Sequence, residues 1–365
     1  MKRKILTYQY IGLFLLIILF SEGYSQTTYF NKRYELTPFA TWDYGKTVLQ
    51  QGDNYIVQGE TFGEFGWRTL AIMKVDSIGT IVWIKTIGDT ISEHASGYPG
   101  SLVVGSDDKF YCTANRRSYT TNWVHDRGLL IKYNTDFDTL WTKEYGESTT
   151  PYDTSYIFWN MNKTRDNGFI FTGGTYPYNA MNASAYLLKT DSSGNKQWDK
   201  TFTNLSGDTQ GFSVIQTSDG GYAIGAFQYY HVAPPNLTGD PIVIKTDSLG
   251  NQEWVKNLGS HFPDTQAMLA LSDDGNILAL SAYADSMANS DEAYKRHRII
   301  KMDNSGAIIW DKFYLASQYY MNPLNIRVGN DGSIITTGRS MITFPLWVGW
   351  MMKCNSEGDS IWYRE

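Results

Sequence analysis

Nine side chains stand in segments that vary from one part of the chain to the next, and their rings can bind a sugar face or a protein surface. They are Trp67, Trp123, Tyr176, Tyr178, Tyr229, Tyr230, His231, Tyr294 and Trp347. An aromatic ring offers an apolar face, and Tyr and Trp add a polar edge for hydrogen bonds. We interpret these residues as candidate ligand contacts. The alternative is that the rings cover the interiors of their own loops.

Other patterns that carry chemistry are weak. The five His (His94, His125, His231, His261 and His297) are scattered without the spacing of metal ligands. There is no G-x-S-x-G motif for a nucleophilic Ser and no phosphate-binding Gly loop. Carboxylates that could cleave glycosides are recognised by their separation in space, which the sequence does not give. The sequence therefore predicts no metal and no cofactor, and it leaves any catalytic residues unknown.

The candidate residues are embedded in a repeat. A Lys and a Trp recur six times, always nine residues apart, and successive Trp residues are 52 to 58 positions apart. The pairs are Lys74 and Trp83, Lys132 and Trp141, Lys189 and Trp198, Lys245 and Trp254, Lys301 and Trp310, and Lys353 and Trp362. A fixed period of about 50 residues indicates a solenoid, a propeller or an array.

Each repeat reads as four strands, which we call a, b, c and d in chain order. In the fourth repeat these are the apolar runs near 212–216, 222–227, 241–246 and 252–257. Asp-Gly or Asn-Gly between a and b is a strong hairpin signal. Four-stranded antiparallel units of this length are typical of propeller blades. The sequence therefore predicts an all-β β-propeller with six blades, and seven blades as the alternative.

The alternative rests on the segment "YFNKRYE" at 29–35, which resembles a lone strand d. Phe30, Lys32 and Tyr34 match Trp198, Lys200 and Phe202. The last repeat has its own strand d at 360–365, so two strands compete for one place.

The repeated residues are expected to be structural. Each Trp on strand d should pack on the neighbouring sheet, near the small residues after strand b, because a large aromatic buries about 150–250 Å². Each Lys on strand c should lie at the blade edge, either solvated or paired. Asp191, Asp247 and Asp303 are interpreted as turn residues whose side chains accept bonds from backbone N–H groups. A calcium loop is the alternative for these Asp residues.

The N-terminus has the pattern of a secretory signal peptide. Lys2, Arg3 and Lys4 precede the apolar run 11–20 and the small-residue site at 23–25. We therefore expect a signal peptide at 1–25 and a single propeller domain at 26–365. A signal anchor is the alternative, although ten apolar residues are too few to span a bilayer. The two Cys, Cys112 and Cys354, fall in separate blades and are expected to remain unbridged.

Composition limits the partners. The 365 residues carry a net charge of −6 and include 26 Tyr and 12 Trp. Mild acidity without a basic stripe argues against nucleic acid. We expect a secreted or cell-surface monomer of a bacterium, without a membrane span after signal cleavage, that has a glycan or protein as its ligand.

The strand c–d motif resembles the tryptophan-docking repeats of quinoprotein (PQQ-like) propellers, with Trp198 four residues after Gly194. The gap from Asp to Gly is one residue shorter here, and no quinone-binding residues match. Over about residues 30–365 the repeats resemble those of secreted Bacteroidota propeller proteins built from "DGGY…KTDSxGNxxW" units. Such proteins often end in a type IX sorting domain, which this sequence lacks, either because the protein has none or because the sequence is truncated.

These observations favour a non-catalytic binding module that uses the loops between strands b and c. Two alternatives stay open. One is an enzyme acting on polysaccharide, as a glycosidase or lyase, and the other is a structural scaffold domain of a larger secreted protein.

Overall fold

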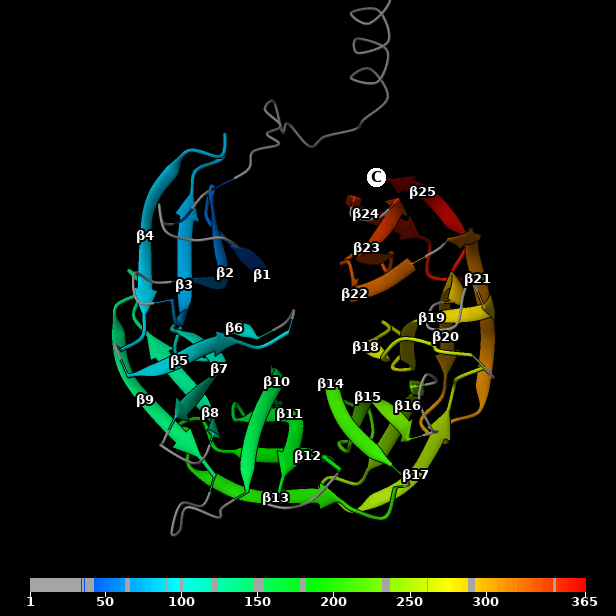
Figure 1. The fold of residues 1–365 in the computed structure, drawn as a ribbon, viewed down its shortest axis with the longest axis horizontal. Coiled ribbons are helices and arrows are strands. Elements are labelled where there is room, and N and C mark those ends of the chain that lie inside the picture. The colour runs from blue at the N-terminus through cyan, green and yellow to red at the C-terminus, as the bar shows by residue number, and fades with distance from the viewer. Residues whose placement is uncertain are drawn as a thin grey trace, which may run out of the picture.

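The computed structural model describes residues 34, 36, 43–62, 66–89, 91–98, 101–119, 124–146, 154–177, 182–205, 207–231, 237–260, 262–287, 293–318, 320–343 and 346–365. Within these ranges the chain forms 25 β-strands in six antiparallel sheets, and no helix is found. Figure 1 shows the six sheets arranged as blades around a central channel, which confirms the predicted β-propeller. Within the described ranges there is also no helix that could cross a membrane.

The strands follow the chain blade by blade, with strand a lining the channel and strand d on the outside (Figure 1). Blade 1 is β1 (Tyr44–Gln51), β2 (Asn54–Phe62), β3 (Arg68–Val75) and β4 (Ile81–Ile87). Blade 2 is β5 (Ser92–Ser96) with β6 (Leu102–Val104), β7 (Phe110–Tyr119), β8 (Val124–Tyr133) and β9 (Thr139–Tyr145). Blade 3 is β10 (Ser155–Lys163), β11 (Phe169–Tyr176), β12 (Ser184–Thr190) and β13 (Lys196–Phe202).

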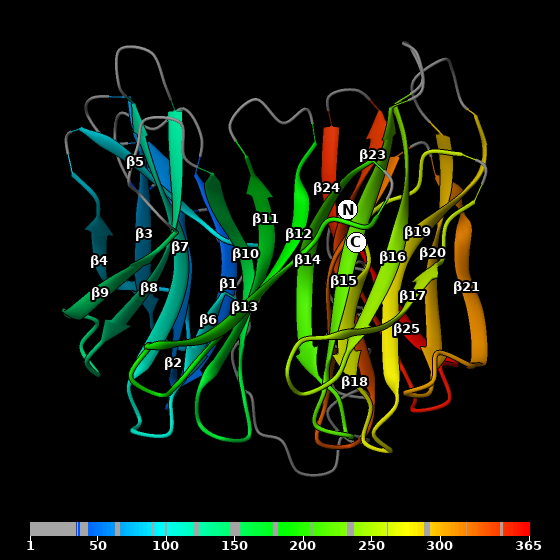
Figure 2. The same cartoon turned by 90° about the horizontal axis from the view of Figure 1, so that it is seen from below.

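The second half repeats this order. Blade 4 is β14 (Asp208–Gln216), β15 (Tyr222–His231), β16 (Leu237–Thr246) and β17 (Gln252–Asn257). Blade 5 is β18 (Met268–Leu271), β19 (Ile277–Met287), β20 (Ala293–Met302) and β21 (Ile308–Gln318). Blade 6 is β22 (Tyr320–Val328), β23 (Ile334–Thr343), β24 (Leu346–Cys354) and β25 (Ser360–Arg364). Figure 2 shows the strands running between two faces of the disk, so that the ends of b and the starts of c share one face, which we call the b–c face.

The Trp of strand d wedges each blade against the next, but at a different place from the one predicted. The ring lies on the c–d turn of the following blade and not near the small residues after strand b. An added Cβ on Gly250 would lie 2.6 Å from the Trp198 ring, and one on Gly358 would lie 2.9 Å from Trp310. Both glycines have positive φ, which a side chain disfavours. The Gly of the motif is therefore required both for the turn and for the wedge.

The Asp of the c–d turn has the predicted structural role. The Asp191 carboxylate accepts bonds from the backbone N–H groups of Ser193 (2.9 Å) and Asn195 (2.7 Å). Asp247 and Asp303 repeat the same pair of bonds in blades 4 and 5. Both Cys are buried and free, as expected.

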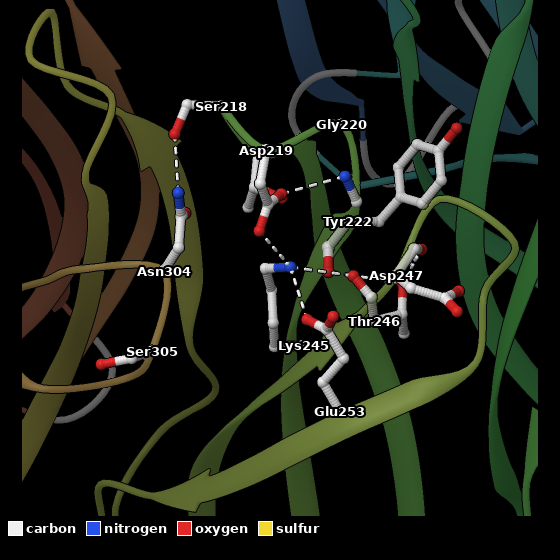
Figure 3. Close-up of polar contacts among 12 residues, drawn as sticks. Ser218, Asp219, Gly220, Tyr222, Lys245, Thr246, Asp247, Glu253, Asn304 and Ser305 are labelled. Carbon is white, nitrogen blue, oxygen red and sulfur yellow. Dashed lines mark hydrogen bonds and ion pairs between the residues drawn. The ribbon is translucent and has the colours of Figure 1, made fainter.

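The Lys of strand c is paired in blades 2 to 6, which was one of its two predicted states, but in the central blades it is buried and does not lie at the blade edge. In Figure 3 the Lys245 side chain points between the a–b turn and strand d of its own blade. Its Nζ, with 0 % exposure of the side chain, lies 2.8 Å from Asp219 and 2.8 Å from Glu253, and it donates to the Thr246 carbonyl at 2.9 Å. Lys132, Lys189, Lys301 and Lys353 make the equivalent ion pair with their own a–b turns.

Replacing Lys245 by Met should lower the free energy of unfolding by about 1–3 kcal/mol, because it leaves two carboxylates and a buried carbonyl without their donor. Asp219 and Glu253 are themselves partly exposed and regain water, which keeps the cost below that of a fully buried pair. Lys74 is the matched control, since among the described residues it has no carboxylate partner. Urea denaturation of Lys245→Met and Lys74→Met should separate the two, and equal losses would contradict the role assigned to this Lys.

Candidate functional site

In four of the six blades, the inner strand carries a bulge that leaves one residue out of the pairing. The register shifts between Gly45 and Thr47 in β1, between Phe158 and Asn160 in β10, and likewise in β14 and β22. A bulge leaves one residue out of the pairing and re-aims its side chain. The four bulge residues are Lys46, Trp159, Phe212 and Leu324. These four residues share one backbone position, but their side chains differ in chemistry from blade to blade.

Three rings from blades 2, 3 and 4 gather in the channel. The Trp159 and Phe212 rings lie parallel with centroids 6.1 Å apart, and Tyr98 meets both edge-on at 5.4 Å and 5.1 Å. The Trp159 indole N–H donates to the Gln210 amide oxygen at 3.2 Å. The three rings form an aromatic platform, in which the Trp159 N–H is bonded to a side chain of β14.

Beside this platform the b–c face is hollowed by two adjoining cavities, of about 590 Å³ and about 220 Å³. Both are lined by Lys46, Glu60, Arg68 and Tyr98. The larger one adds Arg339 from blade 6, and the smaller one adds Arg117 and Asp126 from blade 2. We call the two cavities together the basin. Four cations and two carboxylates line it.

Two of the basin cations, Arg68 and Arg117, are paired with carboxylates that are less exposed than the cations themselves. Arg117 forms a two-point ion pair with Asp126, at 2.7 Å and 3.0 Å, and Arg68 donates to Glu93 at 3.0 Å and 3.3 Å. Both Arg side chains keep 33 % of their surface exposed, whereas Asp126 and Glu93 keep only 10 % and 13 %. Charge-assisted pairs of this kind fix the orientation of the guanidinium groups. The basin therefore presents oriented positive charge that is ready for an anion.

Lys46 differs from these Arg residues because its partner is distant. Its Nζ lies 3.9 Å from the Glu60 carboxylate. It also lies over two aromatic rings, 5.4 Å from the centroid of Tyr44 and 5.5 Å from that of Tyr98. Burial lowers the pKa of Lys46 below its usual value. The Glu60 charge opposes this shift, and the charges of Arg339 and Arg68 add to it. Lys46 is thus the basin cation most ready to give up its proton.

Glu60 is held in place from the neighbouring blade. Its carboxylate accepts bonds from the Ser96 backbone N–H at 3.2 Å and from the Ser96 hydroxyl at 3.5 Å. Glu60 occupies the position of Gly174 and Phe227 in blades 3 and 4, just after the last repeat residue of strand b. The basin is therefore built where blades 1 and 2 depart from the repeat.

The five predicted loop residues whose side chains are described lie around the b–c face and are not gathered into one cluster. Trp67 packs on Tyr119 with ring centroids 5.0 Å apart, and Tyr294 is exposed in blade 5. Tyr176 is half-buried at the end of β11, where burial, followed by the charge of Asp208, raises its pKa. Tyr229 meets Phe227 edge-on, and the Tyr230 hydroxyl donates to Gln228 at 3.2 Å.

The other four predicted residues can be placed only in part. Trp123 and Tyr178 lie outside the described residues, and so do the side chains of His231 in β15 and Trp347 in β24. As ligand contacts, all nine therefore remain predictions.

Sequence reasoning missed the basin residues because it looked for rings on loops. Lys46, Glu60, Arg68, Arg117 and Arg339 lie on strands, near the ends that reach the b–c face. A signal was available in the sequence. Where one blade has a different residue from the others at an aligned position, that residue does not serve the structural role that the repeat shares, and it becomes a candidate for function. Lys46 aligns with Trp159 and Phe212, and Arg339 aligns with Glu60.

Imidazoles and metal ligands are not part of the basin in the described part of the chain. His297 is buried beside Thr336, with 3.1 Å between Nε2 and the hydroxyl oxygen, and burial lowers its pKa to about 3. Where side chains are described, no three His, Cys, Asp or Glu converge as metal ligands.

Several solved propellers share this fold at low sequence identity. A protein of unknown function from Dyadobacter fermentans matches with a TM-score of 0.54 and 10% identity, over 84% of this chain and 93% of that one. A polysaccharide lyase of family PL25, an ulvan lyase solved with a bound glucuronate–rhamnose sulfate unit, matches with a TM-score of 0.53 and 8% identity, over 87% and 83%. The NanB sialidase of Streptococcus pneumoniae gives 0.52 and 10%, over 82% and 65%. No curated protein sequence matches significantly.

A family model gives a more specific relationship. The model described as arylsulfotransferase (ASST) matches residues 150–338, which run from just before β10 into β23 and make up just over half of the chain. The chain belongs to the arylsulfotransferase (ASST) family.

Proposed function

We propose that this protein is an enzyme that acts in the basin on a ring-bearing sulfate ester, either an aryl sulfate or a sulfated sugar. The observation that carries the proposal is a basin of four cations beside an aromatic platform, in which Arg68 and Arg117 are held in place by carboxylates that are largely buried. A sulfate group needs such donors, and an aryl or sugar ring fits against aromatic faces. Membership of the arylsulfotransferase family supports a sulfate ester as the anion.

The proposed roles follow from the geometry. Arg68, Arg117 and Arg339 hold the oxygens of the sulfate, and Tyr98 with Trp159 supports the ring. The hydroxyl of an acceptor attacks the sulfur, the bond from sulfur to the leaving oxygen breaks, and the acceptor proton passes to neutral Lys46. Stabilisation of the leaving oxygen by the fixed cations lowers the barrier, because they need no reorganisation during the reaction.

Cleavage of an acidic polysaccharide is the second candidate function. The sequence had already left an enzyme acting on polysaccharide open as an alternative. The ulvan lyase similarity supports it only through the shared fold. The specific observation in its favour is that Lys46 lies next to the phenols of Tyr44 and Tyr98. Abstraction of a proton beside a uronate carboxylate needs a cation, a base and an acid, and these groups can supply all three.

The proposal includes a secreted or cell-surface location, as the N-terminal pattern and the resemblance to secreted Bacteroidota propellers suggest. A non-catalytic glycan- or protein-binding module is then the competing interpretation.

One set of assays separates these functions. Purified protein is incubated with 4-nitrophenyl sulfate and a phenol acceptor, and separately with a sulfated uronate polysaccharide. Release of nitrophenolate with sulfation of the acceptor supports the first proposal, and formation of unsaturated uronate ends supports the second. Calorimetric binding without turnover of either substrate would instead support a binding module and refute the enzyme.

The pH dependence should report Lys46. Since the neutral amine is the base, kcat should rise with pH through the lowered pKa of Lys46 and then level off. Glu60 raises the pKa of Lys46, so Glu60→Gln should move the rising limb to lower pH. A pH profile of kcat for the two proteins checks this, and a shift to higher pH would contradict the assignment of Lys46 as the base.

A further inference from the structure

The side of blade 1 that faces away from blade 2 is uncovered. Val48 in β1 is 59 % exposed. The residues at the same register position of the other blades are at most 2 % exposed, because each packs on the preceding blade. They are Leu102, Met161, Val214, Leu269 and Ile326. Blade 1 therefore lacks the preceding neighbour that every other blade has.

The side of blade 6 that faces away from blade 5 is uncovered in the same way. Met351 in β24, two residues before the repeat Lys, is 43 % exposed. The equivalent residues of blades 1 to 5 are 0 % exposed, and each shares an apolar cluster with the buried residue of the next blade named above. They are Ile72, Leu130, Leu187, Val243 and Ile299. Blades 6 and 1 do not form this interface.

Figure 1 shows the resulting opening between the blue strands of blade 1 and the red strands of blade 6. All five other successive pairs of blades have strands packed on one another, and no comparable strand packing joins blade 6 to blade 1 among the described residues. The side chain of Trp362 in β25, the sixth repeat Trp, makes no hydrogen bond or ring contact with another described residue. The wedge that joins the other blades is absent there.

Part of the opening is already occupied. The Tyr34 hydroxyl donates to the carbonyl of Gly79 in the c–d turn of blade 1, at 2.8 Å. In blades 3 and 6 the same carbonyl accepts from a Tyr on strand d of the preceding blade: Tyr145 to Gly194 at 2.7 Å, and Tyr314 to Gly358 at 2.6 Å. Tyr34 therefore stands where strand d of a preceding blade would place its Tyr. The other residues of the segment 29–35, on which the sequence alternative rested, lie outside the described residues.

We propose that a seventh blade fills the opening, with Tyr34 at the position of its strand d and a further repeat unit, joined in sequence to β25, as its strands a, b and c. The chain passes from strand d of each blade to strand a of the next five times, so a unit after β25 arrives at the opening in the right order. A ring closed by strands from both ends of a chain leaves no free sheet side.

The proposal goes beyond the proposed function but touches the same site. The basin is lined by Tyr44 and Lys46 of blade 1 and by Leu324 and Arg339 of blade 6, which lie on either side of the opening. Strand a of the seventh blade would form the missing wall between them. Residues of that strand that differ from the aligned residues of the other blades would then help to select the substrate.

A first test asks whether six blades can close without the seventh. Val48→Cys with Met351→Cys is oxidised and compared with the control pair Val214→Cys with Leu187→Cys, whose positions share one apolar cluster. We expect the control pair to form a disulfide and the Val48 pair to stay reduced, because a blade's width separates its two positions. Equal cross-linking of both pairs would overturn the proposal.

A second test supplies the missing strands. A copy of residues 203–246, which carries strands a, b and c of blade 4, is appended after Glu365. It should raise the midpoint of thermal unfolding by more than about 4 °C, and this gain should shrink in Tyr34→Phe, whose ring cannot donate to Gly79. An unchanged midpoint, or light scattering that shows two copies of the 365-residue chain covering each other's openings, would refute the seventh blade. Neither test depends on catalytic activity.

Discussion

Replacing Lys46 by Met is expected to lower kcat about 10²- to 10⁴-fold, the usual contribution of a positioned general base. Met keeps the length and the apolar stem of Lys but has no group that accepts a proton. Since the Lys46 amine makes only one long ionic contact, to Glu60 at 3.9 Å, the fold should be little affected. Steady-state rates with 4-nitrophenyl sulfate or the acidic polysaccharide check the prediction.

Lys200→Met is the matched control for this variant. Lys200 lies on the outer strand β13 and donates to Asn251 at 3.0 Å, away from the basin. Its replacement should leave kcat unchanged. If Lys46→Met and Lys200→Met were equally active, Lys46 would not be the base, whatever the substrate.

The largest loss of stability is expected from Trp254→Ala. The Trp254 indole lies against Gly306 of the next blade and donates to the Asn304 carbonyl at 2.9 Å. Truncation removes a half-buried ring and leaves that carbonyl without its donor, so the free energy of unfolding should fall by about 2–4 kcal/mol. Trp362→Ala changes the same repeat residue where no following blade packs on it.

Chemical denaturation of these two variants measures the wedge directly. We expect Trp362→Ala to cost less than about 1 kcal/mol, since surface substitutions usually have small effects. Equal losses for the two variants would mean that the indole contributes within its own blade and not between blades.

The architecture could be predicted from the sequence because every blade repeats the same motif. A Lys and a Trp nine residues apart, with Asp and Gly between them, fix the turn and the strands on either side through local hydrogen bonds and positive φ. Six independent copies make such a pattern hard to misread. Even so, the partner of the Trp was placed at the wrong end of the neighbouring sheet, because contact between blades depends on the strand offset, which one unit does not reveal.

The basin could not be predicted from these local patterns. Lys46 and Arg339 are almost 300 residues apart in the sequence, and only the ring brings them to one cavity. Neither residue belongs to a motif, and both replace a residue that other blades use differently. The loop aromatics were more conspicuous in the sequence, yet the described ones are spread around the b–c face. In a repeat protein, departures from the repeat are therefore a better guide to a site than unusual loop residues.

The opening between blades 1 and 6 was partly visible in the sequence as two strands competing for one place. In the structure the two do not share one place, since β25 is strand d of blade 6 and Tyr34 holds the carbonyl that a strand d preceding blade 1 would hold. The exposure of Val48 could not have been foreseen, because its sequence environment matches that of its buried counterparts.

The most direct measurement of the central claim is an electron-density map from crystals soaked with 4-nitrophenyl sulfate. The account predicts sulfate oxygens within hydrogen-bond distance of Arg68 and Arg339, with the aryl ring against Tyr98 and Lys46 beside the ester. Ligand density at the loop aromatics, with none in the basin, would contradict it.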